Sequence, residues 1–527
     1  MIVINSADYV ISELQNEIGK IPPVFLPIGN KHILKYQVAF LRDKYSDESI
    51  YVSLPQNYSL SKHEINILTE LRVKPIFVKD NLTLGMALLY VLNSIGTYDG
   101  SIRLLHGDTL IKDLPEGDDF VCIGTTTNDY KWKNYKSFFD SNSVWAGFFS
   151  FSSITKFLTS LASVQGNFVE AVTTYNDEMS LSFVNVNEWY DVGHVNTYFT
   201  SRCTITTQRA FNSLRISDGV VWKSGEPTKK IEAEANWFDN IPSKLKRYIP
   251  QFIEAGCCSD KPFYVTEFVS CLPLNELYVY GRNTVHYWSK IFDLIFDFMQ
   301  AAKNSFPKDN LSLIHDVKIG SDSLFRDKTL SRLNDYSSKQ NFELTSSVIY
   351  EGKILPSTIN IANECIEKSL ALPIVNTILH GDLCLSNIIY DSRSENIKVI
   401  DPRGLDFKNN FSIYGNQVYD ISKLIHSIVG MYDFIIADLY ELNYSEDNGW
   451  SLIFNEEQRY KDIQRNLMER KIIDKEVISM DLLIPPTILL FLSMIPLHFD
   501  KPNRQKAMLA NAYRLYSMYM CKKEHLG

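Results

Sequence analysis

Three oxygen-bearing side chains stand at short intervals in the second half of the sequence. Asp382 is followed five residues later by Asn387, and Asp401 ends the next apolar run. Transfer of a γ-phosphoryl group needs Mg²⁺ held by hard oxygen ligands, and it needs a carboxylate that accepts or orients the proton of the attacking hydroxyl. The spacing therefore predicts metal-assisted phosphoryl transfer, with Asp382 as the base and with Asn387 and Asp401 as metal ligands.

The residues around this motif indicate the class of substrate. Gly381 stands where protein kinases carry the Arg that anchors a phosphorylated activation loop, which favours a small molecule over a protein as substrate. The run His380-Gly381-Asp382-x4-Asn387, followed by Asp401, resembles the aminoglycoside phosphotransferase and choline kinase superfamily. That resemblance implies ATP and Mg²⁺ as cofactors. The alternative is a buried hairpin whose Asp and Asn only cap turns.

An earlier segment offers a cation for the phosphates. Residues 204–217 and 219–223 are predicted to be strands joined by a turn, which places Lys223 inside a strand. The helix that follows, opened by Thr228, carries Glu234 on its apolar stripe, where a carboxylate needs a partner. We expect Lys223 to be that partner. The alternative is that Lys223 is a solvated strand residue.

The kinase resemblance assigns further nucleotide contacts. It implies that Lys223 holds the α- and β-phosphates of ATP while Glu234 orients it. No Gly-rich loop covers the phosphates, and Asn212 and Ser213 are what the chain offers instead. Glu267 lies in the expected hinge between two lobes, whose backbone would read the adenine. Arg403 has two open interpretations, a clamp on a phosphate or sugar hydroxyl and an ion pair with a nearby Asp.

The larger lobe of the kinase is expected to be mainly helical. The helix that begins near Val418 carries Asp420, which the resemblance places as a brace for the catalytic loop rather than in the chemistry. His315 and His426 are interpreted as ordinary core or surface histidines. The apolar run 482–499 is interrupted by three prolines, which favours buried helices over a membrane span.

The first two hundred residues form a separate unit in which strands and helices alternate. Such alternation predicts a doubly wound, mostly parallel sheet with ligands at the carboxyl ends of its strands. Asp108 follows the strand expected at 101–105, and Asp191 lies near the end of the unit. The two carboxylates are candidates to hold one Mg²⁺ against a nucleotide. For Asp108 alone, a turn residue at the end of a strand is an equally good interpretation.

Three motifs of this unit resemble the sugar-1-phosphate nucleotidyltransferases: residues 23–31, Gly107-Asp108, and residues 189–193. The chain departs from that family in two features. It lacks the Gly-rich, Arg-containing loop after the first strand, and Pro23 stands where a Lys is expected, although Lys20 or Lys31 offers a substitute charge. Active nucleotidyl transfer, with CTP or another nucleoside triphosphate, and a degenerate module that only binds sugar nucleotides therefore both stay open.

Composition bounds the remaining possibilities. The 527 residues suggest more than one domain, and we expect a nucleotidyltransferase-like domain over 1–202 and a kinase over 203–527. A net charge of −9 argues against nucleic acid and anionic membranes as partners. Eight scattered cysteines lack metal-ligand spacing and indicate reduced core thiols in a cytoplasmic protein, and the N-terminal apolar run is interpreted as a strand rather than a signal peptide.

The combined expectation is an α/β chain in which a Rossmann-like, nucleotidyltransferase-like domain precedes a two-lobed α+β domain of the protein-kinase type. ATP would phosphorylate a hydroxyl of a sugar, polyol or aminoalcohol, and the N-terminal domain would convert the product to a nucleotide conjugate. The resemblance suggests capsule or surface polysaccharide synthesis as the context. Two alternatives stay open: an N-terminal binding module that regulates the kinase, and a scaffold without enzymatic activity.

Overall fold

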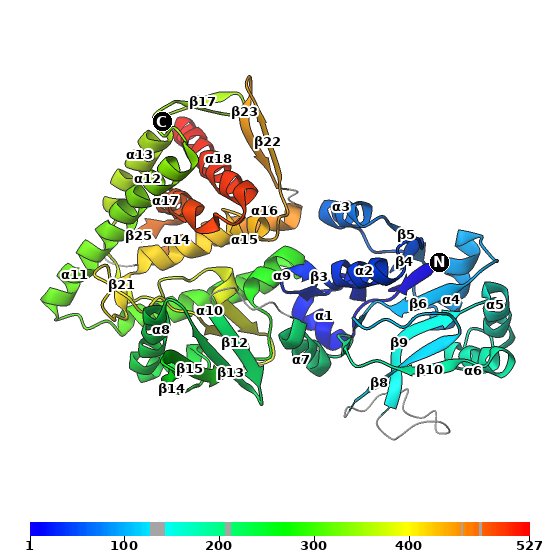
Figure 1. The fold of residues 1–527 in the computed structure, drawn as a ribbon. Helices are drawn as coiled ribbons and strands as arrows, with labels where there is room; N and C mark the ends of the chain where they lie inside the picture. The colour runs from blue at the N-terminus through cyan, green and yellow to red at the C-terminus, as the bar shows by residue number, and fades with distance from the viewer. Residues whose placement is uncertain (127–142, 206–211, 455–456, 474–476, 527) are drawn as a thin grey trace. The chain divides into compact units, whose positions relative to one another are not determined.

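The computed structural model describes residues 1–126, 143–205, 212–454, 457–473 and 477–526. The chain divides into two compact units (Figure 1). The first comprises residues 1–207 together with the short segment 280–282, and the second comprises residues 208–279 and 283–527.

A seven-stranded sheet forms the centre of the first unit, in the order β10-β8-β9-β6-β1-β4-β5. Its strands are β1 (Ile2–Asn5), β4 (Ile50–Pro55), β5 (Val73–Val78), β6 (Ile102–His106), β8 (Phe120–Thr125), β9 (Ser143–Phe151) and β10 (Ser182–Asn185). All of its pairs are parallel except the two made by β9. The sheet is therefore mostly parallel, as the alternation of elements predicts.

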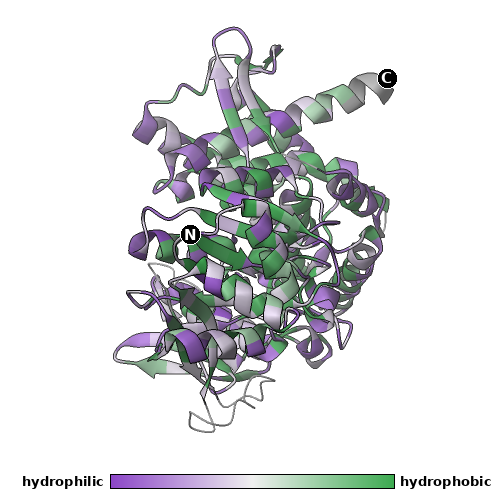
Figure 2. Cartoon of the chain, turned by 90° about the vertical axis from the view of Figure 1, so that its right-hand side faces the viewer, coloured by the Kyte–Doolittle hydropathy of each residue, from purple (hydrophilic) through white to green (hydrophobic). Residues whose placement is uncertain are grey.

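Both faces of this sheet are covered, because successive residues of a strand point to opposite sides. In β1, Ile2 and Ile4 belong to one hydrophobic core and Val3 to the other. The first core includes residues of α2 (Ile33–Lys44) and α3 (Lys62–Glu70), and the second includes residues of α4 (Leu84–Ile95), α5 (Ile154–Ser163) and α6 (Phe168–Met179). This is a doubly wound arrangement. In Figure 2, hydrophobic residues lie mostly inside and hydrophilic residues mostly at the periphery.

Smaller elements complete the first unit. They are α1 (Ser12–Ile18), α7 (Val195–Ile205), and the two-stranded ribbons β2 (Pro27–Ile28) with β3 (Lys31–His32) and β7 (Thr109–Ile111) with β11 (Trp189–Asp191). The strand predicted to begin at Thr204 is wrong at its start. Thr204 lies in the last turn of α7, where its hydroxyl donates to the carbonyl of Thr200 one turn earlier. Residues 206–211 of that expected strand lie outside the described residues.

The second unit begins with a small antiparallel sheet in the order β12-β13-β15-β14. Its strands are β12 (Asn212–Ser217), β13 (Val220–Gly225), β14 (Phe252–Cys258) and β15 (Lys261–Glu267). The turn at Asp218-Gly219 joins β12 to β13, as predicted. Helix α8 (Thr228–Asn240) packs on β13 and β15 (Figure 1). A small sheet carrying one helix forms the smaller of the two lobes.

The larger lobe is mainly helical. Its principal helices are α9 (Leu274–Tyr280), α10 (Val285–Asn304), α11 (Leu311–Asp322), a π-helical turn (Ser323–Asp327), α12 (Lys328–Gln340), α13 (Thr358–Leu370), α14 (Gln417–Ile428), α15 (Tyr432–Ile436), α16 (Gln458–Met468), α17 (Ile484–Met494) and α18 (Pro502–Leu526). Its strands are β16 (Val348–Tyr350), β17 (Lys353–Leu355), β18 (Asn376–Ile378), β19 (Ile388–Asp391), β20 (Asn396–Val399), β21 (Tyr414–Asn416), β22 (Glu441–Ser445), β23 (Gly449–Ile453), β24 (Lys471–Ile473) and β25 (Val477–Ser479). Ribbons β18–β21 and β19–β20 border the loop that carries the predicted catalytic residues.

One stretch within the described residues, 480–498, is long and apolar enough to cross a membrane by length and composition. Most of it, 72%, is buried inside the protein, and α17 packs on α12, α13, α14 and α18. The prediction of buried core helices is therefore confirmed. The cysteines are all free, but Cys257 and Cys258 are exposed on β14, so they are not core thiols.

Candidate active site

The loop from β18 to β19 carries Asp382 and Asn387, and it lies next to Asp401, so the three predicted oxygen-bearing side chains come to one place. The amide nitrogen of Ile400 donates to the carbonyl of Asn387 (3.0 Å), so Asn387 and Asp401 lie at the same end of the β19–β20 ribbon. The side-chain amide of Asn387 donates to the backbone carbonyl of Asp382 (2.9 Å) and to its carboxylate (3.1 Å). A five-residue interval in sequence thus becomes a direct contact.

His380 holds this loop against the neighbouring strand. Its Nε2 bonds the carbonyl of Ile400 (2.9 Å), its Nδ1 accepts from the backbone N–H of Asp382 (3.3 Å), and its own carbonyl accepts from the N–H of Arg403 (2.8 Å). Complete burial lowers the pKa of His380 to about 4, although Asp382 opposes that shift. The ring is therefore neutral at physiological pH, with one nitrogen donating and the other accepting.

Asp420, near the start of α14, braces the same loop. Its carboxylate accepts from the backbone N–H groups of His380 (2.8 Å) and Gly381 (2.7 Å), as the resemblance implies. Gly381 has φ +80°, and a Cβ there would lie 2.7 Å from the Cβ of Arg403. Only glycine accommodates this backbone conformation together with so close an approach. The geometry thus requires glycine at position 381.

The predicted ion pair between Lys223 and Glu234 of the small lobe forms, and Lys223 also contacts Asp401, the predicted metal ligand. The Lys223 ammonium lies 2.6 Å from Glu234 and 2.8 Å from Asp401. The Tyr264 hydroxyl donates to Glu234 (2.9 Å), whose side chain is fully buried. Burial opposes the charge on Lys223, but Asp401 and Glu234 outweigh it and raise its pKa above the ordinary value. The interpretation of Lys223 as a solvated strand residue is therefore excluded.

Close packing sets the distance between α8 and the loop after Asp401. Gly404 has φ +65°, and a Cβ there would lie 2.1 Å from the carbonyl oxygen of Ala233, next to Glu234. Asp401 itself has φ +56°, a conformation that costs energy for a residue with a side chain. Strained backbone of this kind is common where a functional group must point in one direction. With this backbone conformation, the carboxylate of Asp401 points toward Lys223.

Asp382 has a different electrostatic partner. Its carboxylate lies 2.9 Å from the ammonium of Lys423 in α14, and its side chain remains 43% exposed. Burial alone would raise the pKa of Asp382, but Lys423, Arg403 and His380 together hold it well below its ordinary value. Asp382 is thus ionised and reachable from solvent. The carboxylate of Asp401 is reachable as well, with 38% of its side chain exposed.

The donor set at the end of the ribbon fits a hard divalent cation. Asp401 offers carboxylate oxygens, and Asn387 offers an amide oxygen because its nitrogen is committed to Asp382. Oxygen ligands of these two types are what Mg²⁺ prefers. Asn387 and Asp401 would therefore hold the ion.

The other predicted nucleotide contacts have mixed outcomes. Asn212 and Ser213 pair in β12 with Gly225 and Ser224 of β13, but their side chains lie outside the described residues. The Glu267 carboxylate accepts from the backbone N–H of Gln251 (2.8 Å), so this side chain ties β15 to the start of β14. A role of its backbone in nucleotide binding stays a prediction.

Arg403 does not form the ion pair with Asp406, one of the two interpretations from the sequence, in the described part of the chain. Its guanidinium donates to the hydroxyl of Tyr419 (2.8 Å) and lies over that ring. Asp406 instead accepts from the backbone N–H groups of Lys408 and Asn410 in its own turn, so the predicted Arg403–Asp406 pair is wrong. The clamp on a phosphate or a sugar hydroxyl remains a prediction.

Sequence reasoning missed Lys423, Lys328 and Tyr419. Lys423 touches Asp382, and the Lys328 ammonium donates to the Tyr419 hydroxyl (3.1 Å). A signal for Lys423 was present, because it lies in an apolar helix that is buried along its whole length. A lysine in such a helix needs a counter-charge.

The carboxylates of the N-terminal unit also come together. Antiparallel pairing of β7 with β11 places Asp191 opposite Thr109, next to Asp108. Burial and the nearby charge of Asp191 raise the pKa of Asp108 to about 6. Asp191 accepts from the N–H of Gly193 (2.8 Å) and bonds the ring of His194 (3.0 Å). The half-buried Asp108 and the buried Asp191 are adjacent, which supports their predicted role without testing it.

The chain that follows β1 offers little to a triphosphate. It leads to α1, which begins at Ser12, and its first glycine is Gly19. Of the two substitute cations, Lys20 lies over the ring of Tyr9 and Lys31 over the ring of Tyr36. Both are thus held by aromatic rings of their own unit.

A second group of potential ligands in this unit is better explained as a hydrogen-bond network. His32, His63 and Glu64 place one possible ligand atom each within 4.8 Å of one another. The Glu64 carboxylate, however, already accepts from Tyr58 (2.6 Å), from Ser61 and from the Arg282 guanidinium (2.8 Å). A saturated carboxylate beside a guanidinium is a poor cation ligand, so this cluster is structural.

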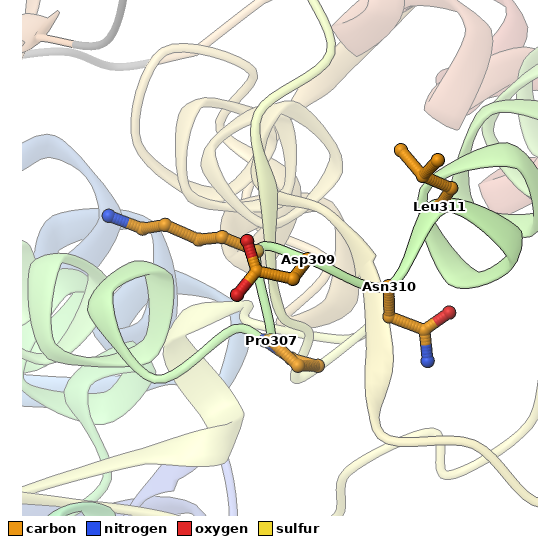
Figure 3. Close-up of a pocket in the computed structure, with 5 residues that line it drawn as sticks. Pro307, Asp309, Asn310 and Leu311 are labelled. Atoms are coloured by element: carbon orange, nitrogen blue, oxygen red, sulfur yellow. The ribbon is translucent and has the colours of Figure 1, made fainter.

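A hollow of about 550 Å³ lies on the loop between α10 and α11. It is lined by five consecutive residues, 307–311, which follow one stretch of chain rather than converging from several elements (Figure 3). It includes none of the site residues. We assign it no function.

Comparison with known proteins gives similar folds only. No protein-family model and no curated protein sequence matches the chain. A nucleoside-diphosphate-sugar pyrophosphorylase from Vibrio cholerae RC9 is 12% identical, with a TM-score of 0.30 over 38% of this chain and 99% of that one. HddC from Yersinia pseudotuberculosis is 17% identical, with a TM-score of 0.27 over 38% of this chain and 97% of that one.

Other similar structures correspond to a larger share of the chain. The GDP complex of an aminoglycoside 2′-phosphotransferase is 14% identical, with a TM-score of 0.36 over 60% of this chain and 91% of that one. The similar structures therefore include both sugar nucleotidyltransferases and aminoglycoside phosphotransferases, the two classes that the sequence motifs resemble.

Proposed function

We propose that the chain is an ATP- and Mg²⁺-dependent kinase that phosphorylates a hydroxyl group of a small molecule. The observation that carries this proposal is the continuous network from Glu234 through Lys223 to Asp401, which lies next to the contact between Asn387 and Asp382. A buried cation, two oxygen ligands and an ionised carboxylate are the parts that phosphoryl transfer needs.

Each part has a defined task in this proposal. Lys223, oriented by Glu234, would bind the α- and β-phosphates of ATP, and Asp401 would bind the metal. Mg²⁺ bound by Asn387 and Asp401 would neutralise charge on the phosphate oxygens. Asp382 would orient the acceptor hydroxyl and receive its proton. Because its pKa is held low, Asp382 acts mainly by orientation, which suits a loose transition state.

The direct test is to incubate the full-length protein with Mg²⁺, labelled ATP and a library of sugars, polyols and aminoalcohols together with their phosphate- or carboxylate-bearing derivatives. Transfer of label to one acceptor is expected, and a matched Asp401→Asn variant should lose it. A thermal-unfolding assay with AMP-PNP and Mg²⁺ serves as an acceptor-independent test, because a ligand that binds only the native state raises its stability. No stabilisation of the wild type by AMP-PNP would contradict the proposal.

We further propose that the N-terminal domain, residues 1–202, acts on the product of the kinase domain, residues 203–527. With CTP or another nucleoside triphosphate it would make a nucleotide conjugate for capsule or surface polysaccharide synthesis, in the cytoplasm where ATP is available. Covalent linkage of the two domains would raise the local concentration of the intermediate. The adjacent Asp108 and Asp191 support this proposal.

Two alternatives to this function are a regulatory N-terminal domain and a scaffold without enzymatic activity. The missing Gly-rich loop favours an N-terminal domain that binds a nucleotide sugar and regulates the kinase. A purely structural scaffold is disfavoured, because a scaffold has no need of a buried lysine that is shared by Glu234 and a half-exposed Asp401. Binding of AMP-PNP with Mg²⁺ distinguishes the scaffold from a kinase, whether the N-terminal domain of that kinase is a transferase or a regulatory module.

A further inference from the structure

Cationic side chains gather on the large-lobe side of Asp382. They are Lys328 and Arg332 of α12, Arg403 of the loop after Asp401, and Lys423 of α14. The hydroxyl of Tyr419 joins two of them, because it accepts from Arg403 (2.8 Å) and from Lys328 (3.1 Å). Tyr419 and Lys423 lie one helical turn apart on α14, so the group approaches the carboxylate of Asp382.

This group carries more positive charge than the protein neutralises. Lys423 forms an ion pair with Asp382, whereas Lys328, Arg332 and Arg403 have no ion pair with any carboxylate of the described residues. The carboxylate of Asp420 is taken up by two backbone N–H groups. These three cations are half-buried, so their charge is costly without a counter-charge. An anionic ligand would supply one.

The titration of two neighbouring groups reflects the same surplus. Burial would raise the pKa of Tyr419, but Arg403, Lys328 and Lys423 lower it to about 7. Burial and then the repulsion of Arg403 and Lys423 lower the pKa of Lys328 to about 8, although Tyr419 opposes that shift. Both shifts are those expected inside a positive field.

The position of the group separates it from the proposed nucleotide contacts. Asp401 reaches Lys223 of the small lobe, whereas Asp382 reaches Lys423 of the large lobe. Asp420 fixes α14 to the catalytic loop, which sets the distance from Lys423 to Asp382. The π-helical turn Ser323–Asp327 ends directly before Lys328, and such turns are frequent at functional sites because they redirect the side chains that follow.

We propose that the phosphoryl acceptor is an anion, namely a hydroxyl compound that also carries a phosphate or carboxylate group. This proposal rests on the kinase function proposed above. Arg403 and Lys328 would bind the anionic group, and the hydroxyl would lie at Asp382. Transfer breaks the bond between the γ-phosphorus and its bridging oxygen, forms a bond from that phosphorus to the acceptor oxygen, and releases ADP and the hydroxyl proton by way of Asp382. An aminoalcohol would instead meet repulsion from the same cations.

The test compares acceptors that are matched in size and differ in charge. With AMP-PNP and Mg²⁺ saturating the full-length protein at constant ionic strength, thermal unfolding is followed with glycerol, ethanolamine, D-glycerate, glycerol 3-phosphate and inorganic phosphate. At least one anion should raise the unfolding temperature, whereas glycerol and ethanolamine should not. Comparison of D-glycerate with the two phosphates distinguishes a carboxylate ligand from a phosphate ligand.

Variants tie this effect to the cationic group. Lys328→Gln and Arg403→Gln should each weaken the apparent affinity for the anion at least tenfold. Lys328→Arg, which keeps the positive charge, should retain most of the wild-type affinity. Lys339→Gln changes an exposed lysine of the same helix and should have no effect.

The opposite outcomes count against the proposal. If no anion stabilises the wild type, if ethanolamine or glycerol stabilises it more than the anions do, or if both Gln variants retain the affinity, the acceptor is not anionic. These results would leave the kinase itself standing, because stabilisation by AMP-PNP is measured before any acceptor is added.

Discussion

The carboxylate of Asp382 is positioned between two side chains that do different work. Asn387 donates to it and Lys423 neutralises it. Asp382→Ala, or the isosteric Asp382→Asn, should therefore lower acceptor-dependent release of ADP by about 10²–10⁴-fold, the range typical of a lost general base. Binding of AMP-PNP should persist, because the nucleotide contacts lie elsewhere. A coupled assay for ADP together with thermal unfolding checks both parts.

A matched control for this prediction is Asp239→Asn, which changes an exposed carboxylate at the end of α8. It should leave both the rate and the unfolding temperature unchanged. Retention of most of the activity in Asp382→Asn would remove this residue from its assigned role. Loss of AMP-PNP binding in the same variant would indicate a disturbed fold instead.

His380 should make the stability of the second unit depend on pH. Its pKa is about 4 in the folded protein and near its ordinary value of 6.5 when unfolded, so the unfolded chain binds more protons between these values. Its contribution is complete above pH 6.5 and is lost as the pH falls toward 4, up to about 3 kcal/mol. Urea unfolding at pH 7, 6 and 5 should show a flatter acid decline for His380→Gln.

The exposed His315 provides the control, because His315→Gln should keep the pH dependence of the wild type. Parallel profiles for His380→Gln and the wild type would show that protonation of His380 does not limit stability in acid.

Local spacing decides which site residues a sequence can reveal. Asp382 and Asn387 share one loop, and Lys223 and Glu234 lie on a strand and the helix that follows it, so periodicity brings each pair together. Lys328 reaches the site from a helix that carries no motif and is separated from Asp382 by more than fifty residues. Only the packing of α12 against its neighbours in the large lobe places such a residue, and a single sequence does not encode that packing in a readable pattern.

At the scale of elements, α14 is the structural support of the catalytic loop through Asp420. Burial raises the pKa of Asp420 to about 7, although the hydrogen bonds that it accepts from two backbone N–H groups lower it. Asp420→Asn would place an amide nitrogen near one of those donors, which should cost about 1–3 kcal/mol of stability and lower kcat at least tenfold with a smaller change in KM. Steady-state kinetics with unfolding measurements would reveal this pattern.

Asp433→Asn is the matched control, because Asp433 is another buried carboxylate with a pKa raised by burial to about 7 and lies in the neighbouring helix α15. It bonds the side chain of Ser427, whose hydroxyl accepts from the N–H of Leu385, so it reaches the catalytic loop only through that serine. Asp433→Asn should therefore lower kcat less than Asp420→Asn does. Equal losses of kcat in both variants would contradict a specific brace at Asp420.

Elements with a clear hydrophobic periodicity could be placed from the sequence. The boundary between a helix and the strand that follows it could not. The strand predicted at 101–105 lies at Ile102–His106, one residue from the prediction at each end. Thr204 was assigned to a strand because Thr favours strands, yet it extends α7. Propensity is a weak guide where tertiary context lets a helix continue.

At the scale of the whole molecule, two units were predictable from two different motif sets. The segment 280–282, which belongs to the first unit although the chain around it belongs to the second, was not. In this segment the hydroxyl of Tyr280 bonds the carbonyl of Asn30, and the N–H of Arg282 donates to the carbonyl of Ile18 (2.7 Å). Such a return of the chain has no local signature, because both contacts engage backbone carbonyls.

The N-terminal unit gives the last prediction, since its carboxylate pair and its missing Gly-rich loop favour different functions. If Asp108 and Asp191 hold a cation against a nucleotide, Asp191→Asn should weaken Mg²⁺-dependent nucleotide binding at least tenfold, whereas Asp177→Asn, an exposed carboxylate of α6, should not. Isothermal calorimetry with CTP, other triphosphates and several nucleotide sugars measures this. Binding of a triphosphate favours a transferase, binding of nucleotide sugars alone favours a regulatory module, and binding that survives Asp191→Asn removes the carboxylate pair from either role.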